Sequence, residues 1–126
     1  MEKIEIEKII EKKDEILIKF LLERLDFLDI LILKKFYLTG NKFPNDVQAY
    51  CFPLLYKELT IQNNVKITQE GLRKRLKTLV KLGILEKVKG SNPSIYLPVR
   101  GKEEFVRELI KKFFVLHGFE NFISNI

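Results

Sequence analysis

The sequence predicts a mainly α-helical protein with one small β-hairpin, an α+β fold. Apolar residues recur at helical spacing along most of the 126 residues, whereas only the segment 84–99 contains two short strand-like runs around a turn. With 46% hydrophobic and 32% charged residues, the composition is that of a chain that folds around its own core. We expect a central unit over residues 26–100, flanked by an N-terminal helix in 1–25 and a C-terminal helix and tail in 101–126.

The first predicted helix, Glu2 to Leu25, has apolar residues on two sides. At 100° per residue one broad stripe is formed by Ile6, Ile9, Ile10, Ile16, Leu17, Phe20 and Leu21. The opposite side contains Ile18, Leu22 and Leu25. The second half of this helix therefore needs cover on both faces, from the core on one and, we expect, from a second copy of the chain on the other.

A central helix follows over about 27–38. Asp26 is a typical N-cap with Asp29 in the first turn, and Gly40 ends the helix. Because the segment is apolar nearly all round, we expect it to lie at the centre of the fold.

The next stretch is expected to be two short helices. Phe43 to Asp46 is a turn and cap that leads into a helix near 47–52, and Pro53 ends that helix and begins another. Asn63-Asn64 closes the second helix. Its buried side is expected to comprise Leu54, Leu55, Tyr56 and Leu59.

Thr68 begins the element with the clearest boundaries. Its hydroxyl can cap free backbone amides, and Ile67 and Leu72 have the spacing of a hydrophobic staple. Gly83 follows the last periodic residue. We expect a helix over about 69–82.

A hairpin and a last helix complete the predicted fold. Strands over 84–89 and 94–99 flank the turn Gly90-Ser91-Asn92-Pro93, and Pro98 confines the second strand to an edge of the sheet. An amphipathic helix follows Gly101, and the tail 119–126 repeats helical apolar spacing and is expected to dock. The predicted buried side of that helix comprises Phe105, Leu109, Phe113 and Leu116.

Residue counts argue against several function classes. Cys51 is the only cysteine and His117 the only histidine, so an internal disulfide and a Cys/His zinc site are excluded. Without a Gly-rich phosphate loop, nucleophile elbow or His-Glu-x-x-His motif, we expect no enzymatic activity, catalytic residue, metal or cofactor. The chain begins with a charged segment and has no apolar run of about 20 residues, so we expect a cytoplasmic protein with no membrane partner.

The positive charge is confined to one segment. The formal net charge is +6, yet residues 65–100 alone hold nine basic residues against two acidic ones, a net charge of +7. The segments before and after it are neutral or slightly acidic. Such an asymmetry is typical of a surface that meets a polyanion.

On a helical projection of 69–82 the basic residues separate from the apolar ones. One side holds Leu72, Leu76 and Leu79, whereas the far side gathers Arg73, Lys74, Lys77 and Lys81 around Glu70. Arg75 projects elsewhere. A helix built this way can lie in the major groove of DNA, where Arg and Lys reach guanine edges and phosphates. The alternative is an ordinary solvated basic face.

The run from Leu72 to Lys87 resembles the recognition helix and first wing strand of winged helix-turn-helix proteins. The similarity lies in the leucine-spaced basic helix, the Leu-x-x-x-Gly-Ile-Leu-type turn and the charged strand that follows. Residues 95–101, Ile-Tyr-Leu-Pro-Val-Arg-Gly, resemble the second wing strand, with Pro98 where many members have Thr. The segment Thr60 to Ile67 is longer than the simplest helix-turn-helix connection, so either the preceding helix runs on to Gln62 or the turn is a longer variant.

The resemblance implies a DNA-binding transcription regulator. Members similar to bacterial and archaeal MarR or PadR regulators dimerise through terminal helices, which the two-faced first helix and the apolar tail match. We expect a homodimer that binds double-stranded DNA sequence-selectively, with Arg73, Lys74 and Lys77 in the major groove. The full predicted contact set is Thr68, Gln69, Arg73, Lys74, Lys77, Thr78 and Lys81 on the helix, and Lys87, Lys89, Ser91 and Asn92 on the wing.

Two other functions fit the same residues. A winged helix can serve as a protein-interaction module of transcription or replication machinery, with its basic face against an acidic partner. RNA binding is a weaker third hypothesis, because no aromatic residue interleaves the basic stripe to stack unpaired bases. For Lys87 and Lys89 the alternative is edge-strand lysines that prevent aggregation.

Overall fold

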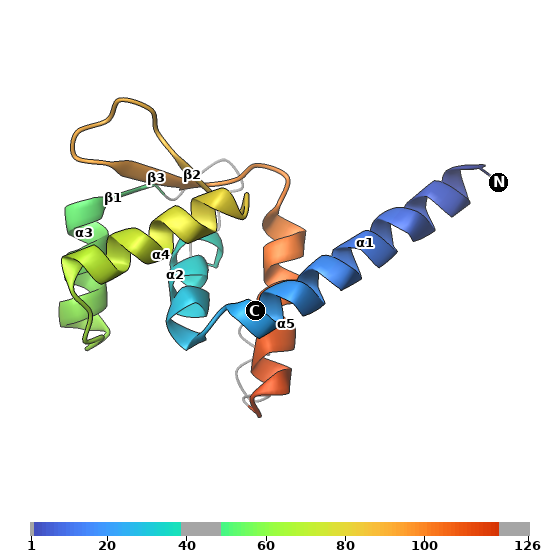
Figure 1. Ribbon diagram of the computed structural model, residues 1–126, viewed down its shortest axis with the longest axis horizontal. Coiled ribbons are helices and arrows are strands. Elements are labelled where there is room, and N and C mark those ends of the chain that lie inside the picture. Colours follow the sequence, from blue (N-terminus) through green and yellow to red (C-terminus); the bar gives the residue numbers. More distant parts are fainter. Residues whose placement is uncertain (1, 39–48, 119–126) are drawn as a thin grey trace.

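The computed structural model describes residues 2–38 and 49–118, with side chains from residue 12 onward. The chain is mainly helical with a small three-stranded antiparallel sheet, which confirms the expected α+β class (Figure 1). In chain order the elements are α1 (Glu2–Arg24), α2 (Phe27–Tyr37), β1 (Tyr50–Cys51), α3 (Phe52–Lys57), η1 (Glu58–Gln62), α4 (Gln69–Lys81), β2 (Leu85–Lys87), β3 (Ile95–Pro98) and α5 (Glu103–Leu116).

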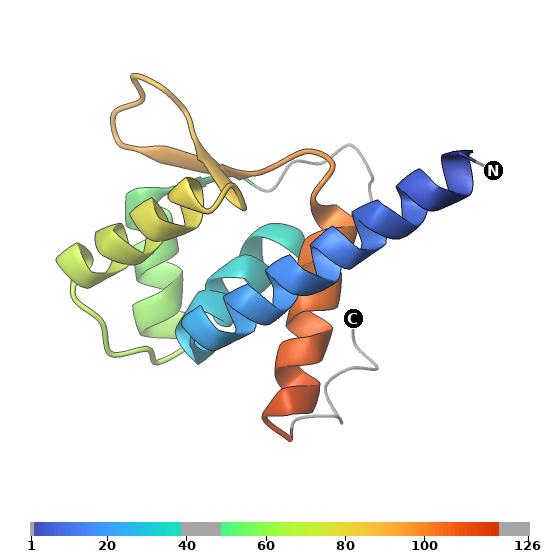
Figure 2. The ribbon, with the colours of Figure 1, turned by 45° about the vertical axis from the view of Figure 1, so that its right-hand side comes forward.

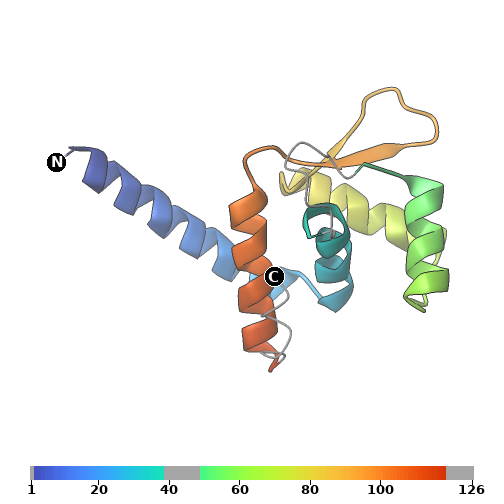
Figure 3. The same ribbon diagram turned by 180° about the vertical axis from the view of Figure 1, so that it is seen from behind.

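Helix α2 lies at the centre of the fold, as its apolar surface predicts. The sheet and α5 both contact it, and α5 packs in turn against α1. Seen from the side, α1 crosses α5 and its N-terminal half projects away from the other elements (Figure 2). From behind, α5 stands beside α2, with its C-terminal end extending past the other helices (Figure 3).

The two predicted N-caps are both present. Asp26 accepts a hydrogen bond from the amide of Asp29 at 3.0 Å, and Asp29 accepts one from the amide of Asp26 at 3.1 Å, which together form a capping box. The hydroxyl of Thr68 accepts a hydrogen bond from the amide of Gly71 at 3.0 Å. A Cβ at Gly71 would lie 3.1 Å from that hydroxyl and 3.2 Å from Ile67, so the close approach favours glycine here.

The prediction of a short helix near 47–52 is wrong for the residues of that segment that the structure describes, from 49 onward. Tyr50–Cys51 forms β1, which pairs antiparallel with β3 so that Tyr50 lies opposite Tyr96. The Tyr50 ring also packs edge-on against Phe36, with centroids 5.3 Å apart. These partners lie far away in sequence, which is why local apolar spacing suggested a helix. Gly40 and the turn 43–46 lie outside the described residues.

The strand containing Pro98 is central in the sheet, not at its edge as predicted. The strand order is β1-β3-β2, so β3 has a partner on each side. Pro98 is the last residue of β3 and pairs with Leu85 on β2, whereas the two-residue β1 reaches only Ile95 and Tyr96. The missing amide hydrogen of the proline therefore costs no pairing with β1. Both hairpin strands are shorter than predicted.

The helix before the connection runs on to Gln62, so the first of the two predicted alternatives is correct. Helix α3 continues into the single π-helical turn η1. Residues 63–67 then form the connection, in which Asn64 has a positive φ of 54°. The hydroxyl of Tyr56 donates to the carbonyl of Ile67 at 3.0 Å and fixes the end of this connection.

Two leucines predicted to be buried are exposed. The buried stripe of α3 and η1 is Phe52, Leu55 and Leu59, and Leu54 lies one residue off that stripe. Leu116 is the last residue of α5, whose C-terminal end extends past the other helices (Figure 3). The tail 119–126, predicted to dock, lies outside the described residues.

The two apolar sides predicted for α1 have different surroundings. Of the side predicted with three residues, Ile18 and Leu25 are buried against the domain and Leu22 is half-buried. Leu21, predicted on the broad stripe, is buried with them, so its assignment to that stripe was wrong. The outer face holds Ile16, Leu17 and Phe20, which are 68%, 37% and 41% exposed. The described chain therefore covers only one of the two faces.

Candidate functional site

Helix α4 is held by its apolar side and presents its basic side to solvent. Leu72, Leu76 and Leu79 are fully buried, one on each successive turn. Arg73, Lys74, Lys77 and Lys81 are exposed on the other side, as the helical projection predicts. Because α4 is amphipathic in this way, its basic residues are fixed in direction by the core beneath them.

A groove of about 660 Å³ lies between α4 and the β-hairpin. Its lining contains four basic side chains, no carboxylate, and the buried aromatic residues Phe52 and Tyr96. We call this feature the basic groove; its lining residues are Phe52, Pro53, Arg73, Lys77, Val80, Lys81, Lys87, Asn92, Pro93, Ser94 and Tyr96. Like charges along one concave surface concentrate the positive potential there and attract anions.

Arg73 is directed toward the basic groove by an aromatic ring. Its guanidinium carbon lies 4.4 Å from the centroid of Phe52, a cation–π contact. Phe52 is itself held in place, because its ring stacks on Tyr56 at 6.1 Å and its amide donates to the carbonyl of Ser94 at 2.8 Å. Arg73 therefore lies on the hairpin side of α4.

Arg75 lies on the opposite side of α4, in a carboxylate cluster. Its Nη1 atom lies 2.6 and 2.7 Å from the two carboxylate oxygens of Asp26 and 3.1 Å from Asp29. Burial acts to lower the pKa of Arg75, but the hydrogen bonds to both aspartates outweigh it and raise that pKa. The charge of Arg75 is thus balanced within the chain, in agreement with its predicted projection away from the basic face.

The same contacts affect the two aspartates differently. Burial acts to raise the pKa of Asp26, but hydrogen bonds from Arg75 and from the amide of Asp29 lower it overall. Burial raises the pKa of Asp29, which is the more enclosed of the two carboxylates. Both aspartates therefore serve the α2 cap and the contact to α4 at once.

The base of the hairpin is fixed to α2 by one hydroxyl group. Tyr37 donates to the carbonyl of Ile84 at 2.8 Å and accepts the amide of Val99 at 2.8 Å. Burial raises the pKa of Tyr37 to about 12, so the hydroxyl stays protonated and able to donate. The two ends of the hairpin are thereby held at a defined distance from α2.

The loop of the hairpin is closed by a predicted contact residue. The Ser91 hydroxyl donates to the carbonyl of Val88 at 2.9 Å and accepts the amide of Ile95 at 3.0 Å. Thr68 is similarly engaged as the cap of α4. Both hydroxyls have structural partners within the chain, and their contact with DNA stays a prediction.

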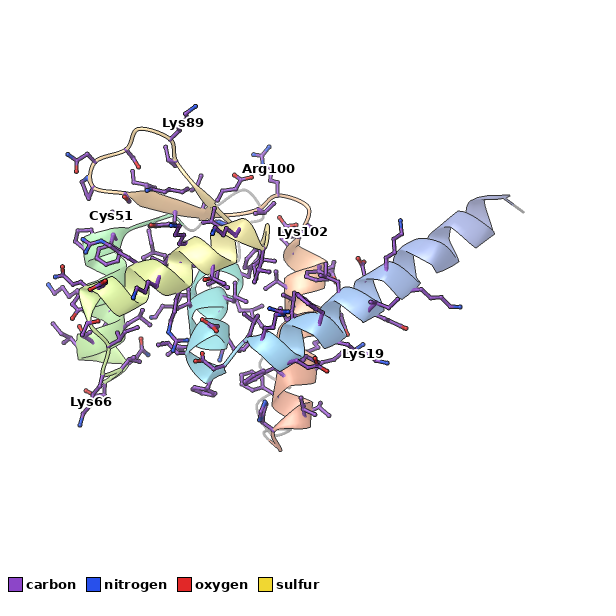
Figure 4. All side chains as sticks on the ribbon, in the orientation of Figure 1. Lys19, Cys51, Lys66, Lys89, Arg100 and Lys102 are labelled. Atoms are coloured by element: carbon purple, nitrogen blue, oxygen red, sulfur yellow. The ribbon has the colours of Figure 1, made fainter. Side chains whose placement is uncertain are left out.

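The remaining predicted residues fall into three groups. Arg73, Lys77, Lys81, Lys87 and Asn92 lie together in the basic groove. Gln69, Lys74 and Thr78 are exposed on α4 beyond the groove lining, where Lys74 is 3.8 Å from Glu70 and the Thr78 hydroxyl bonds the carbonyl of Lys74. Lys89 points away from α4 on the loop of the hairpin (Figure 4). Two further basic residues of the segment 65–100, Arg100 and Lys66, were not predicted as contacts and also lie outside the groove.

The predicted strand over 84–89 would place Lys87 and Lys89 on one strand face, because alternate residues of a strand share a face. In the structure β2 ends at Lys87 and Lys89 follows in the loop, so that expectation is wrong. Only Lys87 lines the basic groove.

Sequence reasoning missed the aromatic floor of the groove. Phe52 comes from the start of α3 and Tyr96 from the middle of β3, and neither belongs to the basic segment's periodicity. Nothing local to Phe52 indicates that it supports Arg73, which is 21 residues later in the chain.

The described residues show few features outside the basic groove that suggest a ligand. They include no group of three or more His, Cys, Asp or Glu residues that could hold a metal ion, and none of their helices is long and apolar enough to cross a membrane. Cys51 is half-buried in β1, and His117 caps α5 with its ring 4.3 Å from that of Phe113. Comparison of the chain with protein-family models, with curated proteins and with solved structures gave no match.

Proposed function

We propose that the protein binds double-stranded DNA as a winged helix-turn-helix transcription regulator, with α4 in the major groove and the β2–β3 hairpin as the wing. The observation that supports this most is the basic groove, in which Arg73, Lys77 and Lys81 on α4 face Lys87 on the hairpin with no carboxylate between them. Phosphates along one DNA strand are a ligand of complementary charge.

The dimensions of α4 suit this role. Its 13 residues form a helix about 20 Å long, and its exposed side is polar along the whole length. The major groove of B-DNA is about 12 Å wide and admits one α-helix. The side chains farthest from the leucine face would reach the base edges first.

The predicted contacts divide into two roles. Arg73, stacked on Phe52 toward the hairpin, is assigned with Lys81 and Lys87 to backbone phosphates. Gln69, Lys74 and Lys77 are assigned to base edges, where Lys binds guanine and Gln binds adenine. The wing residues Ser91, Asn92 and Lys89 would contact the neighbouring backbone or minor groove.

Two alternatives use the same surface. An acidic protein partner would also bind the basic groove, as in a protein-interaction module. RNA recognition through stacked bases is disfavoured, because the aromatic residues of the groove are buried: Phe52 and Tyr96 are 5% and 6% exposed. Competition between duplex DNA, single-stranded RNA and an acidic peptide would rank the three ligands.

The test of DNA binding is its salt dependence. Binding of a fluorescent mixed-sequence duplex of about 20 bp, about two helical turns, is measured by anisotropy over a series of salt concentrations. We expect affinity to fall steeply with salt, and Arg73→Ala, Lys81→Ala and Lys87→Ala each to reduce the slope of log K against log salt by about one unit.

A matched control separates the groove from general charge. Lys112 is an exposed lysine on α5, away from the basic groove, and Lys112→Ala should leave the slope unchanged. Undetectable binding at low salt would exclude the DNA function. Selection from randomised duplexes then shows whether binding is sequence-selective.

We also propose that the regulator is a homodimer that pairs through the outer face of α1. Ile16, Leu17 and Phe20 form an apolar patch that the described chain leaves open. Exposed lysines, Lys12 and Lys13, lie at its N-terminal end and exposed Glu23 at its C-terminal end. At the C-terminal end Arg24 also lies over the Phe20 ring, 4.1 Å from its centroid, so charge alone does not set the pairing. An antiparallel second copy would cover the patch with the same apolar residues of its partner and remove both sets from water.

The dimer has its own test. The wild-type chain should show twice the monomer mass in solution, and Leu17→Glu should make it monomeric because it buries a charge at the centre of the seam. Ile61→Glu is the control, since Ile61 is 65% exposed but lies on η1. A monomeric wild type at micromolar concentration would contradict the dimer. DNA half-sites for a dimer should lie about one helical turn, or a multiple, apart.

A further inference from the structure

Arg75 belongs to the most basic segment of the chain, but its surroundings do not suit a DNA contact. Its Nη1 atom is within 3.1 Å of both Asp26 and Asp29, so one cation is enclosed by two carboxylates. A phosphate approaching this point would meet a net negative cluster. The side chain must serve the site in another way.

The position of the two aspartates indicates that way. Asp26 is the N-cap of α2 and lies at the corner where the chain turns from α1 into α2, and Asp29 lies in the first turn of α2. Arg75 is on α4, 49 residues after Asp26. This contact therefore joins the helix assigned to DNA to the corner from which α1 departs.

The leucine side of α4 alone defines the rotation of the helix about its axis less closely than the hydrogen bonds of Arg75 do. Apolar burial is proportional to area and is not itself directional, so the buried leucines determine which side of α4 faces the core but oppose a small rotation less sharply than directional bonds do. Charge-assisted hydrogen bonds are short and directional. Here they act on the side of α4 opposite to Arg73, where they oppose rotation of the basic face.

We propose that Arg75 is a positioning residue for DNA binding. Its hydrogen bonds to Asp26 and Asp29 set the orientation of α4 relative to the α1–α2 corner, and it does not itself contact DNA. This inference rests on the proposed DNA function. Through α1 the same contact would fix the distance between the two α4 helices of a dimer, and hence the half-site spacing that the dimer prefers.

The decisive variant is Asp26→Ser. Serine retains an N-cap oxygen for α2 but lacks the carboxylate to which Arg75 donates its hydrogen bonds. If Arg75 positions α4, Asp26→Ser should weaken DNA binding by about threefold or more, although the change removes a negative charge. If Arg75 instead contacts phosphate, the same change would free it and tighten binding, which would overturn the proposal.

Arg75→Ala supplies a second sign test in the same assay. A positioning role predicts weaker binding with an unchanged salt slope, whereas Arg73→Ala should reduce the slope by about one unit. The double variant Asp26→Ser/Arg75→Ala should be no weaker than the worse single variant, because both changes break one contact. A reduced slope in Arg75→Ala, or additive losses, would contradict the proposal.

A measurement without DNA distinguishes failure of this inference from failure of the DNA function. Spin labels at Lys19→Cys on α1 and Lys81→Cys on α4, in a Cys51→Ser background and diluted with excess unlabelled protein, report the distance between the two helices within one chain. We expect one narrow distribution in the parent, a broader or shifted one with Asp26→Ser or Arg75→Ala, and no change with Arg73→Ala. An unchanged distance distribution in both Asp26→Ser and Arg75→Ala would overturn the positioning role, whatever the chain binds.

Discussion

Arg73 and Arg75 project from α4 in different directions, toward the hairpin and toward α2, and have opposite electrostatic surroundings. On the hairpin side, Arg73 lies over Phe52 and faces other cations across the basic groove. On the α2 side, Arg75 lies between two aspartates. The two arginines are two residues apart, so the net charge of a segment does not say which of its charges are available to a ligand.

The difference has a physical origin in what each side packs against. The α2 side meets the capping box at the start of that helix, where two carboxylates already gather to accept backbone amides. The hairpin side meets an aromatic floor and a strand with a lysine. One side of α4 therefore stabilises the fold, and the other is left positively charged.

Arg75→Ala should have the largest effect on stability. It leaves Asp29, whose side chain is 12% exposed, without its cation, and we expect a loss of roughly 2 kcal/mol in the free energy of unfolding. The figure is at the low end for charged pairs because 32% of the Arg75 side chain is exposed. Urea denaturation measures the loss. A loss as small as that of Lys74→Ala, an exposed residue of the same helix, would contradict the buried role of the pair.

Tyr37→Phe should have the next largest effect. The change leaves the Ile84 carbonyl and the Val99 amide without their shared hydroxyl, at a cost of about 1–2 kcal/mol. Because these groups hold the hairpin base, amide hydrogen exchange should accelerate in β2 and β3 more than in α1. Uniform acceleration over the whole chain would instead indicate a general loss of stability.

Arg73→Ala tests the hairpin side. We expect a change in stability below about 0.5 kcal/mol, since Arg73 is exposed and its closest contact given by the described residues is the cation–π contact with Phe52. DNA affinity should fall by about fivefold, equivalent to ~1 kcal/mol, with a shallower salt slope. A large stability loss with unchanged affinity would reverse the roles assigned to the two arginines.

Glu70→Gln should have the smallest effect and the opposite sign. Glu70 is the acidic residue on the exposed side of α4 and lies 3.8 Å from Lys74 as an exposed i,i+4 pair. Its neutralisation should cost only about 0.3 kcal/mol of stability and should tighten DNA binding modestly by freeing Lys74. Weaker DNA binding in this variant would argue that Glu70 itself contacts the ligand, for example by accepting from cytosine.

Local patterns in the sequence predict much of this protein. The caps at Asp26 and Thr68, the leucine side of α4, the start of α2 and the basic side of α4 all follow from residues within four positions of one another. Such short-range patterns depend on helical periodicity and local hydrogen bonding, so they can be predicted without knowledge of the tertiary contacts.

Only the tertiary structure decided the remainder. Tyr50 and Cys51 became a strand, and the strand of Pro98 became central, because β1 and β3 meet across more than 40 residues of chain. The partners of Arg75 and the ring beneath Arg73 are equally remote in sequence. The sequence by itself determined which side of α4 is basic, whereas tertiary packing decided which of those charges is neutralised within the chain and which lines an open groove, because both depend on residues that only the fold brings together.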